Sequence, residues 1–375
     1  MSEIVRIKEL AEKYKLTTRT LRFWEEKGLL ESAFRTAGKR RNFGADVEKT
    51  IEDILHYKSK GLSLELIKEM MSKKKKSPAH KSNPIRIVID STSSIDPDLA
   101  NSNEINVIPL YVHLDRKVFL DGVNIHEEDF YERLAQKKKQ PVAIATAPPT
   151  VEDFFSLYST LVQEGARVIC SIHLGEAFSP TVRHAQEAAQ KFQDVSIRVF
   201  DSRTAGQALT MLAIALREKV RSGASQEECE SYLNALILRN WLVLTMTSLN
   251  NLAMLGMLQV NMESAFGSLI REALDFRPVL MIEKGEATFK ILSRSKDLLD
   301  AINTMSSRLK MEVEPCKLKI KMLGISHSRL KDQSEALRIT LEKAYKIPVL
   351  VQKGSVVLCA HLGPASLAVN ALFDV

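Results

Sequence analysis

The segment that most constrains the fold covers residues 168–185, which read VICSIHLGEAFSPTVRHA. Its first six residues are mostly apolar and β-branched, as is typical of a strand buried on both faces. Ser179 directly precedes Pro180, which predicts a helix capped by the serine with the proline at its first position. The free N–H groups of such a helix start favour a phosphate or carboxylate. On these residues alone, an ordinary helix cap is the simpler interpretation.

Strands alternate with helices on both sides of this segment. Apolar runs predict further strands at residues 85–90, 106–112, 143–146 and 197–200, and periodic stretches predict helices at 127–134, from 151, and at 206–220. This alternation is typical of a mostly parallel α/β layer. Polar residues follow several of the strands, and open sheets bind ligands at those strand ends.

The pattern changes beyond a strand at 242–246. Residues 278–283 and 286–292 predict a hairpin, residues 295–309 an amphipathic helix, and residues 318–325, 348–352 and 356–361 further strands. We therefore predict an α/β domain over residues 85–240 and an α+β domain over residues 241–375.

Basic charge is concentrated at the N-terminal end. Residues 1–82 hold 20 Lys and Arg against 12 Asp and Glu, a net charge of +8, whereas the whole chain carries +7. A small unit with this excess is suited to nucleic acid. No apolar run approaches the roughly 18 residues of a membrane span. The start of the chain is polar, and the four cysteines have no metal-site spacing, so we expect a cytoplasmic protein without a membrane span or bound metal.

The basic N-terminal residues predict a helix-turn-helix. Residues 7–14 have helical spacing of apolar side chains, and a second short helix follows Thr17, which can cap it. Gly28 ends this helix, and Thr18, Arg19 and Arg22 lie on its outward face. A basic loop at 35–43 and helices starting near 46 and 61 complete the unit.

These residues resemble the winged-helix module of MerR-type regulators. The matching runs are T-R-T-L-R-F-W-E at 18–25, G-L-L at 28–30, R-N-F at 41–43 and G-L-S-L-E-L-I-K at 61–68. The resemblance implies contacts with double-stranded operator DNA through arginines that pair with phosphates or guanine edges. The residues it implies are Thr18, Arg19, Thr20, Arg22 and Phe23 of the recognition helix, and Arg41 and Phe43 of the wing. The alternative is a four-helix bundle with no role in DNA binding.

The linker departs from the MerR pattern. MerR-type proteins usually continue into a long helix that pairs as a coiled coil, whereas residues 77–84 here form a linker containing Ser and Pro, which follows four lysines. We therefore place the DNA-binding domain at 1–76. Because symmetric operators need a dimer, we expect a homodimer held together by residues 85–375.

Residues 85–375 resemble the DegV family of fatty-acid-binding proteins, which present acyl chains to a fatty acid kinase. The motifs that carry the resemblance occur in order: D-S-T at 90–92, D-G-V-N-I at 121–125, a degenerate A-T-A-P-P-T at 145–150, S-I-H-L and F-S-P-T at 171–174 and 178–181, D-S-R-T-A at 201–205, and C-A-H-L-G-P-A-S-L at 359–367. The whole chain is thus expected to be multidomain, an all-α winged helix-turn-helix followed by a DegV-like two-domain module, α/β and then α+β.

The DegV resemblance implies one long-chain fatty acid between the two DegV-like domains, with no other cofactor. Its carboxylate is expected to meet Thr146, Ser179, Thr181 and His361, together with N–H groups of the helix that follows Ser179. Methionines are adaptable apolar residues and could line the acyl tunnel. The candidates are Met211, Met246, Met254, Met257, Met262 and Met281, together with Phe266.

Three departures from the DegV pattern bear on function. Ser94 stands where the family has an aspartate, Pro180 where it has a glycine, and Met257 where it has an arginine of the head-group and kinase-facing region. The loss of that arginine favours a fatty-acid-responsive transcription regulator over the alternative, an acyl carrier for a fatty acid kinase. An enzyme with Ser179 as nucleophile and His361 as base is not favoured, because no G-x-S-x-G elbow or orienting carboxylate can be named.

Overall fold

The computed structural model describes residues 5–30, 34–35, 41–43, 47–59, 62–65, 67–68, 71, 84–136, 143–247, 249, 276–282, 288–315 and 318–375. The proposed tunnel residues Met254, Met257, Met262 and Phe266 lie outside these described residues. The chain forms two compact units. One comprises residues 1–79 with Arg116–Phe119, and the other comprises residues 80–115 with Leu120–Val375.

The first unit contains short helices and a small antiparallel sheet of strand order β1-β3-β2. The backbone N–H of Thr20 donates to the Thr17 hydroxyl at 3.0 Å, so Thr17 caps the second helix as predicted. Gly28 follows that helix with φ 72°, a conformation that glycine adopts at little cost. The elements are β1 (Val5–Arg6), α1 (Ile7–Lys13), α2 (Thr18–Glu26), β2 (Phe34–Arg35), β3 (Arg41–Phe43) and α3 (Val47–Ser59).

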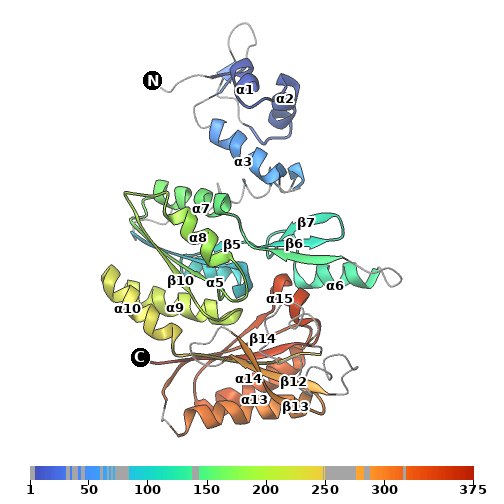
Figure 1. Ribbon diagram of the computed structural model, residues 1–375, viewed down its shortest axis with the longest axis vertical. Helices are drawn as coiled ribbons and strands as arrows, with labels where there is room; N and C mark the ends of the chain where they lie inside the picture. Colours follow the sequence, from blue (N-terminus) through green and yellow to red (C-terminus); the bar gives the residue numbers. More distant parts are fainter. Residues whose placement is uncertain are drawn as a thin grey trace. The chain divides into compact units, whose positions relative to one another are not determined.

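The second unit begins with an α/β lobe around a parallel sheet of order β10-β9-β4-β5. All six residues of β4 are buried, as expected for a strand covered on both faces. Figure 1 shows α7 and α8 on one face of this sheet, and α9 and α10 on the other. The elements are β4 (Ile85–Asp90), α5 (Pro97–Ser102), β5 (Ile105–Ile108), α7 (Val151–Gln163), β9 (Val168–His173), α8 (Thr181–Ala189), β10 (Ser196–Asp201), α9 (Gln207–Arg221) and α10 (Gln226–Ile237).

The strand predicted at 106–112 is interrupted. The structure has β5 and then β6 (Tyr111–Leu114), because Pro109 between them has no N–H to donate to a strand ladder. β6 pairs antiparallel with β8 (Ile144–Ala147). The same part of the chain contains β7 (Lys117–Leu120) and α6 (Glu127–Gln136).

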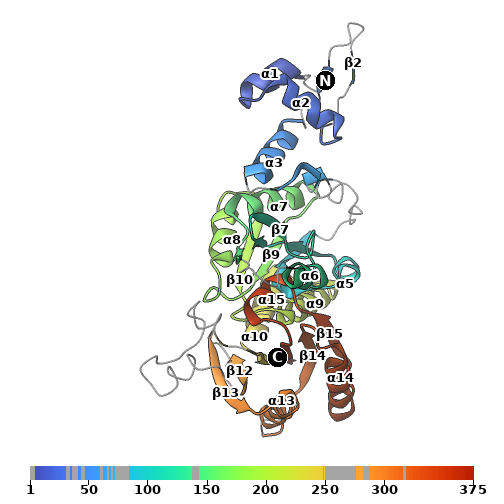
Figure 2. The same ribbon diagram turned by 90° about the vertical axis from the view of Figure 1, so that its right-hand side faces the viewer.

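The C-terminal lobe of the second unit is a six-stranded mixed sheet of order β13-β12-β11-β16-β14-β15. Only the β14–β15 pair in this sheet is parallel. Figure 2 shows α13 and α14 together on one side of the sheet. The elements are β11 (Asn240–Thr245), β12 (Arg277–Ile282), β13 (Phe289–Ser295), α13 (Leu298–Val313), β14 (Ile320–His327), α14 (Lys331–Tyr345), β15 (Val349–Lys353), α15 (Val356–Leu362) and β16 (Leu367–Phe373).

The prediction of a strand at 356–361 is wrong, because these residues form the helix α15. The Ser355 hydroxyl accepts from the Leu358 N–H at 3.1 Å, and a carboxylate oxygen of Asp121 accepts from the Val356 N–H at 2.9 Å. These two interactions satisfy N–H groups of the first turn and outweigh the strand preference of consecutive valines. The last strand is instead β16, buried at all seven positions and not predicted.

Helix α9 packs against both the parallel sheet and the C-terminal sheet. The Gln207 side-chain amide donates to the backbone carbonyl of Leu350 at 2.7 Å. A side chain at Gly324 would meet the Gln207 amide at 2.5 Å, so this close approach requires glycine. The α/β lobe and the C-terminal lobe are therefore joined by packing as well as by the chain.

Candidate functional site

A cavity of about 210 Å³ lies between the α/β lobe and the C-terminal lobe. The α/β side contributes residues that follow the carboxyl ends of β4 and β9, which is where open sheets bind ligands. The opposite side comes from the sheet face that α13 and α14 do not cover, and from α15. The lining residues are Thr92, Leu110, Thr146, Ala147, Pro148, Leu174, Phe178, Ser179, Pro180, Ala205, Gly206, Leu242, Leu244, Phe289, Ser326, Val357, Leu358, His361, Leu362 and Ala368.

Three of the four residues predicted to meet a carboxylate line this one cavity. Thr146 Oγ1 and His361 Nε2 are hydrogen-bonded at 2.8 Å, although 215 positions separate them in the chain. Ser179 also lines the cavity. Burial lowers the pKa of the His361 imidazole, which favours its neutral form.

Thr181 and the helix start differ from the prediction. Thr181 is fully buried and does not line the cavity, and its hydroxyl is hydrogen-bonded to that of Ser179 at 2.8 Å. Helix α8 begins at Thr181 with Pro180 as its cap position, and no side chain caps it. The prediction that Ser179 caps this helix is therefore wrong, because its hydroxyl bonds a side chain rather than a backbone N–H. Thr181 contacts Ser179, which does line the cavity.

One wall of the cavity is apolar. Leu242, Leu244, Phe289 and Ala368 belong to one buried cluster, and the ring of Phe178 stacks on that of Phe289 with centroids 5.3 Å apart. Of the methionines predicted to line a tunnel, the three that the structure describes do not line this cavity. Met211, Met246 and Met281 are buried in core clusters and do not line the cavity.

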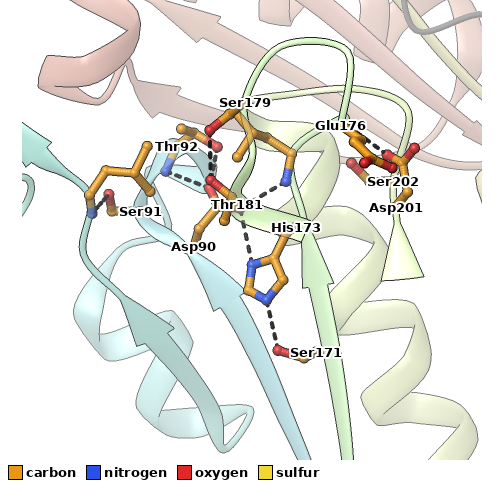
Figure 3. Close-up of polar contacts among 12 residues, drawn as sticks. Asp90, Ser91, Thr92, Ser171, His173, Glu176, Ser179, Thr181, Asp201 and Ser202 are labelled. Carbon is orange, nitrogen blue, oxygen red and sulfur yellow. Dashed lines mark hydrogen bonds and ion pairs between the residues drawn. The ribbon is translucent and has the colours of Figure 1, made fainter. Parts of the chain in front are cut away.

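A buried polar network behind the cavity was not predicted (Figure 3). The Asp90 carboxylate accepts from the Thr92 N–H at 3.1 Å, the Thr92 hydroxyl at 2.5 Å and the Leu174 N–H at 2.8 Å. His173 Nδ1 lies 3.3 Å from the same carboxylate, and Nε2 lies 2.7 Å from the Ser171 hydroxyl, which also bonds Tyr158. We assign the proton to Nδ1, because a carboxylate can only accept. The D-S-T motif was the available signal for this network.

Asp121 links the two lobes. Its carboxyl accepts from the Ser91 hydroxyl at 2.7 Å and from the Val356 N–H at 2.9 Å. Full burial raises the pKa of Asp121 to about 7, and the nearby charge of Asp90 acts in the same direction. The D-G-V-N-I motif therefore supplies a buried acid that fixes the start of α15, the helix carrying His361.

The helix α2 presents the side chains predicted to meet DNA. Arg19, Arg22 and Phe23 are exposed, and Thr18 and Thr20 are half-buried. Leu21 and Trp24, on the opposite face, are buried in the core of the first unit. This division is what an amphipathic recognition helix requires.

The prediction for the wing residues is corrected for one of them, Phe43. Phe43 is fully buried, so its side chain is part of the core and has no surface to offer DNA. An aromatic residue in a short strand is better stabilised by apolar burial than by exposure at a charged surface. The side chain of Arg41 lies outside the described residues.

In the part of the chain that the structure describes, no helix is long and apolar enough to cross a membrane. No group of three or more His, Cys, Asp or Glu side chains there is placed to hold a metal ion.

Comparison with known proteins adds two family matches. Residues 84–374 match the family model described as "Uncharacterised protein, DegV family", and residues 5–74 match that described as "MerR HTH family regulatory protein". A DegV domain-containing protein of Lactococcus lactis, YejH, is 28% identical over 290 residues, covering 76% of this chain and 98% of the relative. A Staphylococcus aureus DegV domain-containing protein, SA1258, is 26% identical over 289 residues, with the same coverages.

Solved structures share the fold of the second unit. A Thermus thermophilus DegV family protein described for its fatty acid binding has a TM-score of 0.68 at 24% identity, over 77% of this chain and 99% of its own. A DegV family protein of Eubacterium eligens, loaded with heptadecanoic acid, has a TM-score of 0.64 at 18% identity, over 77% of this chain and 100% of its own. Both predicted resemblances are confirmed: the chain belongs to the DegV family and carries a MerR helix-turn-helix domain ahead of its DegV domain.

Proposed function

We propose that this protein is a cytoplasmic transcription regulator whose DegV domain binds a long-chain acyl ligand and whose MerR domain binds double-stranded operator DNA. Acyl binding by the DegV domain is supported by the cavity, which is lined by an apolar wall and by Thr146, Ser179 and His361. DNA binding by the MerR domain is supported by the exposed arginines of α2. Fatty acids bound to DegV relatives support the choice of ligand.

The two sides of the cavity have different roles in this proposal. The apolar wall supplies affinity, because each buried methylene contributes about 0.8 kcal/mol. Thr146, Ser179 and His361 supply direction, since a polar head group can form hydrogen bonds with them and not with the apolar wall. In this proposal Thr181 does not contact the acyl ligand, and the side chain of Phe43 does not contact DNA. We retain the domain boundaries 1–76, 85–240 and 241–375 with a linker at 77–84.

The acyl ligand is expected to change operator affinity by about 1–3 kcal/mol, the usual range of coupling free energies. Such coupling requires that the ligand bind two conformations of the protein unequally. The test is an operator titration of the full chain with and without saturating hexadecanoic acid, using the wild type and the variant carrying Ser179→Ala and His361→Ala. We expect the double variant to keep ligand-free DNA affinity and to lose the response.

Two outcomes of this titration would contradict the regulator proposal. Wild-type operator affinity that is unchanged by an acyl chain shown to be bound would favour the alternative, an acyl carrier that presents lipid to a kinase. A response that survives in the double variant would place the ligand elsewhere. Thr340→Ala, an exposed change in α14, is the control for unspecific effects.

The protein is expected to be a homodimer, because operators of this class have two half-sites about 34–36 Å apart. We place the dimer contact in residues 85–375, since the linker sequence lacks coiled-coil heptads. Analytical ultracentrifugation of the full chain and of residues 84–375, the span of a whole DegV relative, is the measurement. A dimeric full chain together with a monomeric, folded 84–375 fragment would show that the contact lies in the first unit.

A further inference from the structure

The floor of the cavity crosses the C-terminal sheet. It takes Ser326 from β14, Ala368 from β16, Leu242 and Leu244 from β11, and Phe289 from β13. In the sheet these strands follow one another in the order β13-β12-β11-β16-β14. Neighbouring strands lie about 4.8 Å apart, so the four steps from β13 to β14 span about 19 Å. The lining residues are therefore spread across the strands, and the two ends of the cavity are lined by different side chains.

The polar pair Thr146 and His361 belongs to the end formed by β14 and β16. His361 lies on α15, and Leu362 of the same helix lines a small pocket together with Ser326 of β14 and Ala368 of β16. Helix α15 therefore packs over this end of the floor. Thr146 lies at the same end, because its hydroxyl is hydrogen-bonded to His361 Nε2 at 2.8 Å.

The β13 end of the cavity carries two aromatic rings, one from each lobe. Phe289 begins β13, and Phe178 lies in the loop between β9 and α8. The two rings stack with centroids 5.3 Å apart and 22° between their planes, and both line the cavity. At this end the wall of the cavity is therefore an aromatic contact between the α/β lobe and the C-terminal lobe.

Both rings are held in place by the protein itself. The Phe178 N–H donates to the Gly175 carbonyl at 2.8 Å, and a side chain at Gly175 would meet the Phe178 ring at 3.2 Å. The Phe178 ring therefore packs on bare backbone as well as on Phe289. Phe289 is 6% exposed and pairs with Ile282 across the β12–β13 hairpin. Rings packed in this way form a firm boundary, since they can move aside for a ligand only by losing these contacts.

We propose that the acyl chain crosses the sheet from Thr146 and His361 to the aromatic stack, and that Phe178 is the specificity-determining residue that sets the longest chain the site accommodates. The inference rests on the proposed acyl-binding function and adds the position of the chain end. Each methylene buried against an apolar wall raises affinity by about fourfold. A chain that has reached the Phe178 ring gains nothing from a further methylene, because the ring occupies the space that the methylene would need.

The test is isothermal titration calorimetry of the delipidated full-length protein with even-numbered saturated fatty acids from decanoic to icosanoic acid. For the wild type we expect affinity to rise with chain length and then to level off. In Phe178→Ala the rise should continue for at least two more methylenes, so that affinity for the longer chains increases by about tenfold or more relative to decanoic acid. Phe178→Trp should level off at a shorter chain than the wild type, because the larger ring moves the boundary into the cavity.

Phe155→Ala is the matched control. Phe155 is 41% exposed in α7, its ring packs against that of Phe192 with centroids 5.2 Å apart, and it is not among the described residues that line the cavity. The change removes the same group from another contact between two phenylalanines, so the chain-length profile should match that of the wild type. If Phe178→Ala does not fold, Phe178→Leu keeps an apolar side chain of smaller size and should shift the profile in the same direction.

The outcomes separate this inference from the function on which it rests. A profile that levels off at the same length in the wild type, Phe178→Ala and Phe178→Trp would overturn the role of Phe178, and so would a wild-type affinity that still rises at icosanoic acid. An equal loss of affinity for every chain in Phe178→Ala would also overturn it, since the ring would then contact the chain without limiting its length. Failure of all the fatty acids to bind the wild type would instead overturn acyl binding itself.

Discussion

Replacing Arg19 and Arg22 together with alanine is expected to lower operator affinity by about 100-fold or more. Both side chains are exposed on α2, while Leu21 and Trp24 hold the opposite face of that helix in the core. Each arginine that pairs with a guanine edge contributes about 1–3 kcal/mol, and each that neutralises a phosphate adds about one to the salt slope. Exposed positions outside the core leave the stability of the first unit almost unchanged.

The measurement is a fluorescence-anisotropy titration of operator DNA over a salt series. The matched control removes two positive charges from α14 by Arg338→Ala and Lys343→Ala, and is expected to bind DNA as the wild type does. Acyl affinity should be the same in all three proteins. If the Arg19 and Arg22 variant keeps both wild-type affinity and salt slope, α2 is not the recognition helix.

Asp90→Ala is expected to destabilise the DegV domain by about 3–5 kcal/mol, because one substitution leaves several buried donors without an acceptor. The change leaves the N–H of Leu174, the hydroxyl of Thr92 and Nδ1 of His173 without their acceptor in a fully buried site. Each unpaired buried donor costs about 1–3 kcal/mol, and local rearrangement recovers part of the sum. Loss of this carboxylate should also loosen Thr92 in the cavity wall.

Urea unfolding followed by the fluorescence of Trp241, in β11, measures this loss. The experiment is done in a Trp24→Phe background, because the chain has two tryptophans and Trp24 belongs to the first unit. Asp96→Ala is the matched control, since Asp96 only caps the exposed start of α5 and its loss should cost about 1 kcal/mol. An Asp90 variant no less stable than this control would show that the buried network does not stabilise the fold.

Local sequence patterns determined the two-part organisation of the chain and most of its elements. The strand at 168–173, the Thr17 cap and the β12–β13 hairpin depend on residues close together in the chain, so they can be predicted without a structure. The ordered motifs also indicated both families. Errors at 106–112 and 356–361 arose where a proline or a distant carboxylate overrode the local preference.

The composition of the cavity was decided by tertiary structure. The hydrogen bond between Thr146 and His361 forms because β8 packs against helix α15. The first turn of α15 in turn depends on Asp121, which accepts from the N–H of Val356, 235 positions away. The sequence alone placed Thr181 among the ligand-contacting residues and gave no role to Thr92. In the folded chain the Thr181 hydroxyl bonds that of Ser179, and the Thr92 hydroxyl bonds the carboxylate of Asp90. Hydrogen-bond direction of this kind depends on the partners that folding brings within 3 Å, and those partners are far apart in the chain.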